Sequence, residues 1–142
     1  MKNTMEKYLQ ALKRQRLKIT PQRRAVIAFL LKRKTHASPY DVYAGVKKNI
    51  PRLGLPTIYR ILEEMKGIGL LTQVLSPDRR LYYSLCAHPE KHHHHFTCRK
   101  CRRVEEVGFC NFKDISRFIE KNIQGKVESH LLQIEGLCSS CK

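Results

Sequence analysis

The sequence predicts an α+β fold divided into two domains, and three observations support this prediction. Helical patterns occupy the chain as far as Gly69, two β-prone runs flanking a turn come next, and strands with a single helix make up the remainder. Residues 1–85 carry 18 Lys and Arg against 5 Asp and Glu, whereas residues 86–142 carry 10 against 7. All six cysteines and six of the seven histidines fall in the second stretch. We therefore expect a basic N-terminal domain and a metal-binding C-terminal domain.

The composition indicates an ordinary globular protein. Hydrophobic residues make up 42% of the 142 residues, which suits one domain or two small ones. No apolar run approaches the roughly 18–20 residues that a membrane helix needs, and the opening stretch MKNTMEKYLQ lacks the apolar core of a signal peptide. We therefore expect a cytoplasmic protein without a membrane partner. Its cysteines should be thiols or metal ligands, because disulfides rarely persist in that compartment.

Helix starts in the N-terminal domain are marked by capping residues. Thr20 and Ser38 are each followed directly by a proline, and Gly54 interrupts the chain before a further helix. Apolar residues at helical spacing predict the buried faces, which comprise Tyr8, Leu9 and Leu12; Val26, Ile27, Leu30 and Leu31; Val42, Tyr43 and Val46; and Ile58, Ile61, Leu62 and Met65. The last of these helices directs towards solvent Thr57, Tyr59, Arg60 and Glu63.

A β-hairpin is predicted to follow these helices. The runs Leu71–Leu75 and Leu81–Leu85 flank the stretch SPDRR, whose Pro and Asp are turn residues. Several short helices followed by a hairpin make a winged helix-turn-helix, in which the exposed face of the last helix enters the major groove of DNA. Arg79 and Arg80 of the wing would then meet phosphates. The alternative is a plain helical bundle with a solvated basic face, but the net charge of +13 over residues 1–85 favours double-stranded DNA as the partner.

The C-terminal domain is predicted to follow a hinge at residues 86–91, where Pro89 prevents regular pairing. The stretches HHHFTC and RVEEVGF read as strands, and FKDISRFIEKN reads as an amphipathic helix that Gly125 ends. The stretch KVESHLLQIEGLC, residues 126–138, reads as one long strand. Such a unit of about 55 residues has a marginal core, so we expect zinc, dimerisation or both to stabilise it.

Two Cys-x-x-Cys pairs predict a structural zinc site. Cys98 and Cys101 form one pair, and Cys138 and Cys141 form the other. Four thiolates from two such turns hold zinc tetrahedrally and leave no position open for substrate. The 36 intervening residues are too many for a simple zinc ribbon, but they suit an excursion through a strand, a helix and a strand. The alternative is four unrelated thiols.

Four consecutive histidines, His92–His95, predict at least one further metal site. In a strand, His93 and His95 point to one side and His92 and His94 to the other, so one run offers two histidine pairs. Each pair needs further ligands from elsewhere in the fold, and the candidates are His36, Cys86, His88, Glu106 and His130. The alternatives are a solvated polar strand, or two ligands and two bystanders.

An enzyme is not expected. A catalytic zinc needs three protein ligands, an open position and a nearby base. The sequence contains no HExxH motif, no deaminase signature, no Gly-rich phosphate loop and no nucleophile elbow. We therefore expect neither a catalytic residue nor a small-molecule substrate.

The motifs together resemble the ferric uptake regulator family of bacterial metal-responsive repressors. The resemblance covers nearly the whole chain, from LKITPQRRAVIAFL through HASPYDVY, LPTIYRIL and HHHHFTCRKC to GLCSSC. It implies a winged-helix DNA-binding domain at residues 1–85, a hinge at 86–91 and an α+β dimerisation and metal-binding domain at 92–142. It also implies a homodimer that binds a palindromic DNA operator when loaded with metal.

Individual residues match the family's functional positions. The structural zinc ligands would be Cys98, Cys101, Cys138 and Cys141. The regulatory metal ligands would be His36, His93, His95 and Glu106. DNA-contacting positions match Lys18, Tyr59 and Arg60, with Thr57 beside them on the exposed face of the helix. A metal that bridges His36 to the strand histidines would fix the angle between the two domains.

Several positions depart from the pattern of iron-sensing members. Iron-sensing members usually have an acidic ligand in the second strand of the wing, and here Tyr82 stands near that position. Cys86, just beyond it, resembles a cysteine of the zinc-uptake regulator branch. A thiolate suits zinc better than ferrous iron, although Cys86 as a small buried residue is the alternative. Thr72 stands where zinc sensors often have an Asp or His ligand. A second metal site at His92, His94 and His130 would lack its acid, because Lys113 occupies that position, and Cys110 is expected to be a buried thiol.

We therefore expect a dimeric, zinc-containing repressor that senses zinc and controls metal uptake genes. Ferrous iron, or manganese, is the alternative regulatory metal, and a peroxide-sensing repressor with redox-active iron is an alternative within the same family. An alternative of another class is a zinc-stabilised DNA-architectural protein that does not sense metal.

Overall fold

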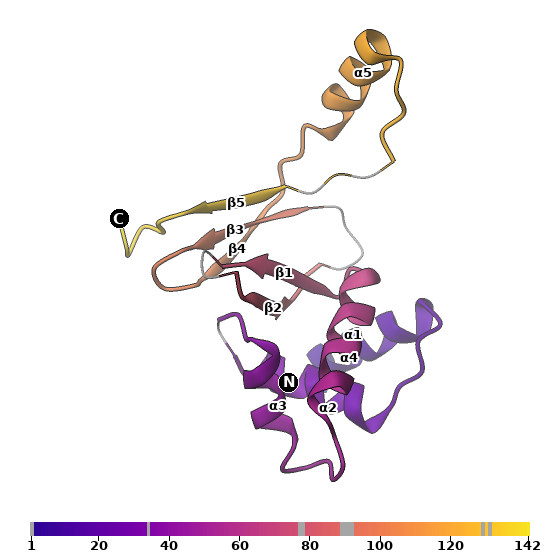
Figure 1. Cartoon of the computed structure of the whole chain (residues 1–142), viewed down its shortest axis with the longest axis vertical. Helices are drawn as coiled ribbons and strands as arrows, with labels where there is room; N and C mark the ends of the chain where they lie inside the picture. The colour runs from indigo at the N-terminus through magenta and orange to yellow at the C-terminus, as the bar shows by residue number, and fades with distance from the viewer. Residues whose placement is uncertain (1, 34, 77–78, 89–92, 129, 131) are drawn as a thin grey trace.

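Helices dominate the first half of the chain and short strands the second (Figure 1). The structure is a computed structural model that describes residues 2–33, 35–76, 79–88, 93–128, 130 and 132–142. Its elements are α1 (Lys2–Arg14), α2 (Pro21–Leu31), α3 (Pro39–Val46), α4 (Leu55–Gly67), β1 (Leu71–Leu75), β2 (Leu81–Leu85), β3 (His94–Cys98), β4 (Val104–Val107), α5 (Phe112–Ile123) and β5 (Gln133–Gly136).

The helix starts predicted from capping residues are confirmed. The hydroxyl of Thr20 accepts a hydrogen bond from the backbone N–H of Arg23 at the start of α2. Ser38 and Asp41 form a reciprocal capping box at the start of α3, which satisfies two otherwise unpaired N–H groups. Gly54 precedes α4 without a side-chain cap. Local chemistry therefore defines where each of these helices begins.

The β-hairpin packs on the helices as a wing. β1 and β2 pair in the predicted antiparallel register, with Leu71 opposite Leu85. The fully buried Tyr83 of β2 donates a hydrogen bond of 2.7 Å from its hydroxyl to the Glu63 carboxylate on α4. Its backbone also bridges Ala37, next to His36. One core joins α1 to α4 with the hairpin, so the wing and α4 are held in a fixed relation.

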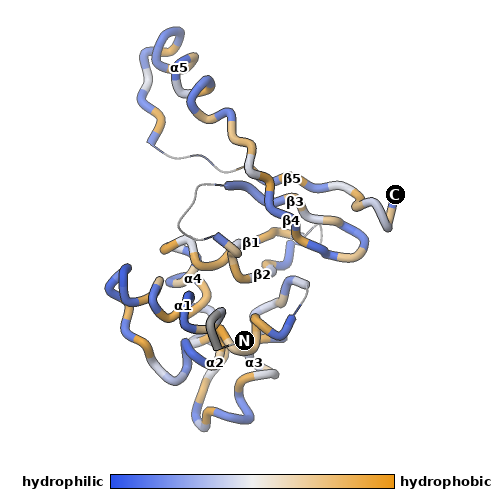
Figure 2. The backbone as a smooth tube through the Cα atoms, turned by 180° about the vertical axis from the view of Figure 1, so that it is seen from behind, coloured by the Kyte–Doolittle hydropathy of each residue, from blue (hydrophilic) through white to orange (hydrophobic). Residues whose placement is uncertain are grey.

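A three-stranded sheet follows the hairpin, with strand order β4-β3-β5. β3 pairs antiparallel with β4 and parallel with β5. Figure 1 shows α5 standing out from this sheet on the connection between β4 and β5, and Figure 2 shows the same from behind. The arrangement confirms the α+β class and its order of strand, strand, helix and strand.

The last strand is shorter than the sequence suggested. Residues 126–138 were expected to form one strand, but among the described residues of that stretch only Gln133–Gly136 do so. These four residues pair with His95–Cys98, and β3 itself spans only five residues. The expectation was wrong because β-propensity cannot produce a ladder where the neighbouring strand has ended.

α5 is amphipathic but buries no residue fully. Its apolar side chains Ile115, Phe118 and Ile123 are exposed, as is Phe109 before it. In Figure 2, hydrophobic and hydrophilic residues alternate along this helix. No described helix is long and apolar enough to cross a membrane.

Candidate metal centres and DNA-binding surface

The two Cys-x-x-Cys pairs meet at one end of the sheet. Cys98 ends β3 and Cys138 follows β5, and because these strands are neighbours their ends lie together. The sulfur atoms of Cys98, Cys101, Cys138 and Cys141 all lie within 4.8 Å of one another. The Sγ atoms of Cys101 and Cys138 are 3.6 Å apart. The sulfur cluster is therefore compact enough for a single ion.

The electrostatics of this cluster fit a cation. Backbone N–H groups of Cys101 and Cys138 direct hydrogen bonds to Cys98 and lower the pKa of its thiol to about 6. The hydrogen bond to Cys138, with burial and the other thiols, raises the pKa of Cys141 to about 12. Four thiolates this close repel one another unless a cation lies between them. The donor set and its geometry are consistent with a structural zinc site.

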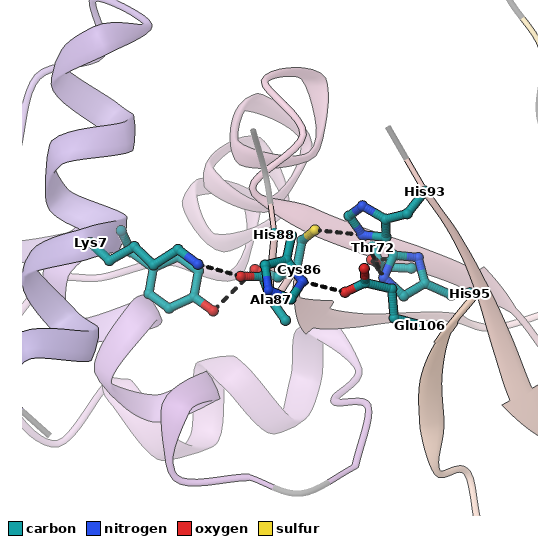
Figure 3. A network of polar contacts seen from close by, with 9 residues as sticks. Lys7, Thr72, Cys86, Ala87, His88, His93, His95 and Glu106 are labelled. Carbon is teal, nitrogen blue, oxygen red and sulfur yellow. Dashed lines mark hydrogen bonds and ion pairs between the residues drawn. The ribbon is translucent and has the colours of Figure 1, made fainter. Parts of the chain in front are cut away.

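A second cluster lies between the wing and the sheet (Figure 3). The Cys86 Sγ, just after β2, is 3.0 Å from His93 Nε2, and His93 Nε2 is 3.2 Å from His95 Nε2. Thr72 Oγ1 on β1 lies 3.2 Å from His95 Nε2 and can orient that ring. The three possible ligand atoms of Cys86, His93 and His95 all lie within 4.8 Å of one another.

Cys86 is positioned by the first helix of the chain. The Tyr8 hydroxyl of α1 donates a hydrogen bond of 3.0 Å to the Cys86 carbonyl, and the Lys7 ammonium donates to the Ala87 carbonyl (Figure 3). The Cys86 N–H donates to the Leu70 carbonyl. Cys86 is buried, as the alternative of a small core residue required, but its sulfur faces two imidazoles.

Among the described residues, Glu106 is not a member of this cluster. It is opposite His95 in the register of β3 and β4, but its carboxylate accepts a hydrogen bond from His88 Nδ1. That hydrogen bond, with the charges of His93 and His88, holds the pKa of the Glu106 carboxyl below its usual range. Glu106 is therefore an ionised carboxylate next to the cluster, and its partner His88 was one of the candidate ligands.

His36, the predicted ligand from the N-terminal domain, interacts electrostatically with His95 but is not among the three residues whose ligand atoms lie within 4.8 Å of one another. It is only 3% exposed, and neither ring nitrogen has a hydrogen-bond partner among the described residues. Burial, followed by the charges of His95 and Arg102, lowers the pKa of His36 to about 4. A buried imidazole without partners is rare, because leaving it unpaired costs free energy. A neutral imidazole is the form that binds metal, so His36 fits a ligand role.

A third cluster lies on the other face of β3. His94 Nε2 is 3.2 Å from His130 Nε2, and His130 Nε2 is 3.5 Å from Cys110 Sγ. The sequence predicted His92, His94 and His130 here, and His92 lies outside the described residues. Cys110 was not predicted to join them. The sequence did contain a signal for Cys110. Position 113 holds a lysine where an acidic ligand is expected, and a thiol three residues earlier can replace that ligand.

The exposed face of α4 carries the predicted DNA-contacting residues. Tyr59 is 36% exposed, Arg60 is exposed and Thr57 is half-buried. Lys18 is exposed and its carbonyl accepts a hydrogen bond of 2.6 Å from Arg23, which also forms an ion pair with Glu64 of α4. Arg23 therefore holds Lys18 beside the helix whose face reads the major groove in a winged helix.

A winged helix joined to a sheet with clustered thiols and imidazoles defines a metal-responsive DNA-binding regulator of transcription. The chain belongs to the ferric uptake regulator family, whose family model matches residues 14–135. Members of this family regulate transcription and are not enzymes, in agreement with the lack of catalytic motifs in the sequence.

Individual relatives differ in what their names say they sense. The chain is 32% identical over 143 residues to the ferric uptake regulation protein of Bacillus subtilis strain 168, covering 99% of this chain and 96% of the relative. It is 24% identical over 142 residues to the peroxide-responsive repressor PerR of Staphylococcus aureus strain Mu50, covering 100% and 94%.

Solved structures share the fold. A zinc uptake regulator complexed with zinc and DNA matches with a TM-score of 0.81 at 20% identity, covering 98% of this chain and 93% of that one. The Helicobacter pylori ferric uptake regulator matches with a TM-score of 0.61 at 23% identity, covering 97% and 93%. These similarities confirm the predicted fold.

Proposed function

We propose that this chain is a zinc-sensing repressor that acts as a cytoplasmic homodimer on a DNA operator controlling metal uptake genes. In this proposal residues 1–85 bind DNA, residues 86–91 form a hinge of which 89–91 lie outside the described residues, and residues 92–142 dimerise and bind metal. The observation that carries the zinc assignment is the Cys86 sulfur 3.0 Å from His93 Nε2. A thiolate among imidazoles is a soft donor set that suits zinc better than ferrous iron.

Two further observations support zinc. Tyr82 stands near the position of the acidic ligand expected in iron sensors, and it is buried beneath Arg102. The zinc uptake regulator with a TM-score of 0.81 was solved with zinc and DNA. The Bacillus subtilis relative at 32% identity is named for ferric uptake, so iron sensing through His36, His93, His95 and Glu106 is the competing assignment.

The sensor would act by joining the two parts of the chain. Cys86 belongs to the wing side, and His93 and His95 belong to the sheet. An ion held by all three, with His36 and Glu106 available beside them, favours the orientation of the wing relative to the sheet in which these ligands meet. Zinc then shifts the population by its differential affinity for that state. In a dimer this sets the spacing of the two α4 helices, and Lys18, Thr57, Tyr59 and Arg60 contact the operator.

The Cys98, Cys101, Cys138 and Cys141 cluster would hold the structural zinc. It ties the end of β3 to the chain end after β5, which stabilises a sheet too small to bury much apolar surface. The exposed apolar face of α5 would contact a second copy of this chain, since an isolated amphipathic helix gains stability only by covering such a face.

The test is operator binding titrated separately with zinc, ferrous iron and manganese at buffered free-metal concentrations. The operator is first selected from random duplex DNA with zinc-loaded protein and again with iron-loaded protein, so that neither metal is favoured in advance. For each metal, the free concentration that gives half-maximal operator binding is divided by the free concentration at which cells buffer that metal. This ratio should be lowest for zinc. Binding that needs ferrous iron would contradict the zinc assignment, and binding unchanged after removal of all but the structural zinc would indicate the architectural alternative.

Cys86→Ser tests the sensor ligand directly. We expect the free zinc needed for half-maximal operator binding to rise by about 10-fold or more, because a hydroxyl is a poor zinc ligand. The matched control is Ser84→Ala in β2, which removes a hydroxyl two residues before Cys86. An unchanged zinc response in Cys86→Ser would return Cys86 to a packing role.

A further inference from the structure

Cys110, His130 and His94 meet although they come from three separate segments. Cys110 lies between β4 and α5, His130 lies between α5 and β5, and His94 is the first residue of β3. The Nε2 atoms of His94 and His130 are 3.2 Å apart, and the Cys110 Sγ is 3.5 Å from His130 Nε2. All three possible ligand atoms lie within 4.8 Å of one another. The chain thus returns to the same point after its excursion through α5.

The His130 ring is held in place from one side. The Phe112 ring stacks on it with centroids 4.2 Å apart and an interplanar angle of 16°. This contact uses the first residue of α5, so the imidazole orientation is coupled to the start of the helix. A ligand whose ring is already fixed by its neighbours loses less entropy when it binds a metal. Supporting contacts orient the ligands of known metal sites in the same way.

The ligand atoms of His94, Cys110 and His130 are two nitrogens and one sulfur. An acid at position 113 would instead have supplied an oxygen. Lys113 is exposed and cationic, so it cannot serve as that ligand. Two imidazoles and a thiolate are softer than two imidazoles and a carboxylate, which shifts preference towards zinc and away from manganese or ferrous iron. His94 and His130 also line a cavity of about 640 Å³ that extends to β1 of the wing.

We propose that Cys110 replaces the missing acid as the third ligand of the second metal site expected at His94 and His130, and that a zinc ion held by these three residues clamps both ends of the α5 excursion to β3. The proposal extends the second metal site predicted from the sequence and does not depend on Cys86 being the sensor. The ion would determine the direction in which α5 leaves the sheet. The site therefore regulates how the exposed apolar face of α5 is presented to a second copy of the chain.

Zinc counting by native mass spectrometry tests the ligand assignment on the full-length protein at buffered free zinc. Cys110→Ala should bind one zinc ion fewer per chain than wild type, and Cys110→Ala with Cys86→Ser should bind two fewer. Cys110→Asp should retain the ion while losing the preference for zinc over manganese. A Cys110→Ala protein with the wild-type zinc count and affinity overturns the proposal. A wild-type count in Cys86→Ser alone contradicts only the sensor assignment.

A measurement without substitution covers the case in which the variants fold poorly. In wild type, zinc should protect Cys110 from alkylation by iodoacetamide, read out by peptide mass spectrometry. Hydrogen exchange should be slower in Phe112–Ile123 with zinc than after partial chelation that leaves the four-cysteine site loaded. Equal alkylation of Cys110 with and without zinc overturns the assignment, and α5 exchange that ignores zinc overturns the clamp.

Discussion

Arg102 connects the four-cysteine turn to the wing through one aromatic ring. Its guanidinium carbon lies 4.6 Å from the centre of the Tyr82 ring on β2, and its backbone has a positive φ of 60°. The Arg102 N–H donates to the Cys98 carbonyl, so the turn that carries the zinc ligands also places this side chain. The contact between Arg102 and Tyr82 therefore joins the wing to the turn after β3 without depending on metal.

Arg102→Ala should weaken the zinc response. A cation–π contact at an exposed site contributes about 0.5–1 kcal/mol, which corresponds to roughly a two- to fivefold higher free zinc for half-maximal operator binding. Arg103→Ala removes the same charge one residue away, where the side chain lies 3.9 Å from Glu105. Fluorescence anisotropy of labelled operator DNA compares the two variants. Equal shifts would mean that the charge, not the Tyr82 contact, matters.

At the level of elements, the packing of α2 against α3 depends on a glycine. A Cβ built on Gly45 of α3 would come within 2.1 Å of the Phe29 ring on α2. Gly67 at the end of α4 has no atom within 4 Å of the corresponding position. Because α3 lies between His36 and α4 in the chain, this close packing bears on both His36 and the predicted DNA-binding surface.

Gly45→Ala should lower the free energy of unfolding by about 1–3 kcal/mol, because the added methyl forces the Phe29 ring or the helix to move. Gly67→Ala is the matched control, and we expect it to be neutral or stabilising by up to about 1 kcal/mol through helix propensity. Urea denaturation followed by far-ultraviolet circular dichroism gives both values. A Gly45→Ala variant as stable as Gly67→Ala would show that α2 and α3 are not in close contact.

The positions of helices and strands were predicted from the sequence better than contacts between distant residues. Thr20, Ser38 and Gly54 define helix starts through hydrogen bonds to residues three or four positions away. Their effect can therefore be predicted from the sequence without knowledge of the fold. The length of β5 is not, because it depends on where β3 ends. Glu106 and Cys110 show the same limit within the candidate sites. Their partners His88 and His130 lie 18 and 20 residues away, and only the folded chain brings them together.

In the whole molecule, two features remain exposed to act on partners. The N-terminal part exposes the face of α4 that is predicted to contact DNA, and it carries most of the net charge of +16. The sheet projects α5, whose apolar face includes Ile115, which is 54% exposed. The four-cysteine cluster lies at the opposite end of β3 from His94, where the proposed structural zinc would join the ends of β3 and β5.

Ile115→Glu should convert the proposed dimer to a monomer, because it places a charge on the apolar face of α5. Lys121→Glu introduces the same residue on the polar face of that helix and should leave the dimer intact. Sedimentation velocity of the zinc-loaded proteins measures both. Dimers of unchanged stability in Ile115→Glu would show that another surface joins the copies.

Cys98→Ser should release the structural zinc and unfold or monomerise the C-terminal part. Cys98 is fully buried, and its sulfur accepts the Cys138 N–H, so a poor ligand there leaves three thiolates without a closed site. Zinc content, sedimentation and thermal unfolding report the loss, with Ser139→Ala between the second pair as the control. A zinc-free dimer that remains folded would refute the structural-site assignment.

Sequence alone determined the features that act over short distances. Capping residues and apolar spacing located the helices and hairpin, and the two Cys-x-x-Cys pairs with the histidine run indicated metal. Tertiary structure decided which side chains share a site. It brings Cys86 to His93 and His95, buries His36, pairs Glu106 with His88, and joins Cys110 to His94 and His130. The physical reason is that ligand geometry depends on strand register and on the path of connecting segments, and these follow from packing of the whole chain.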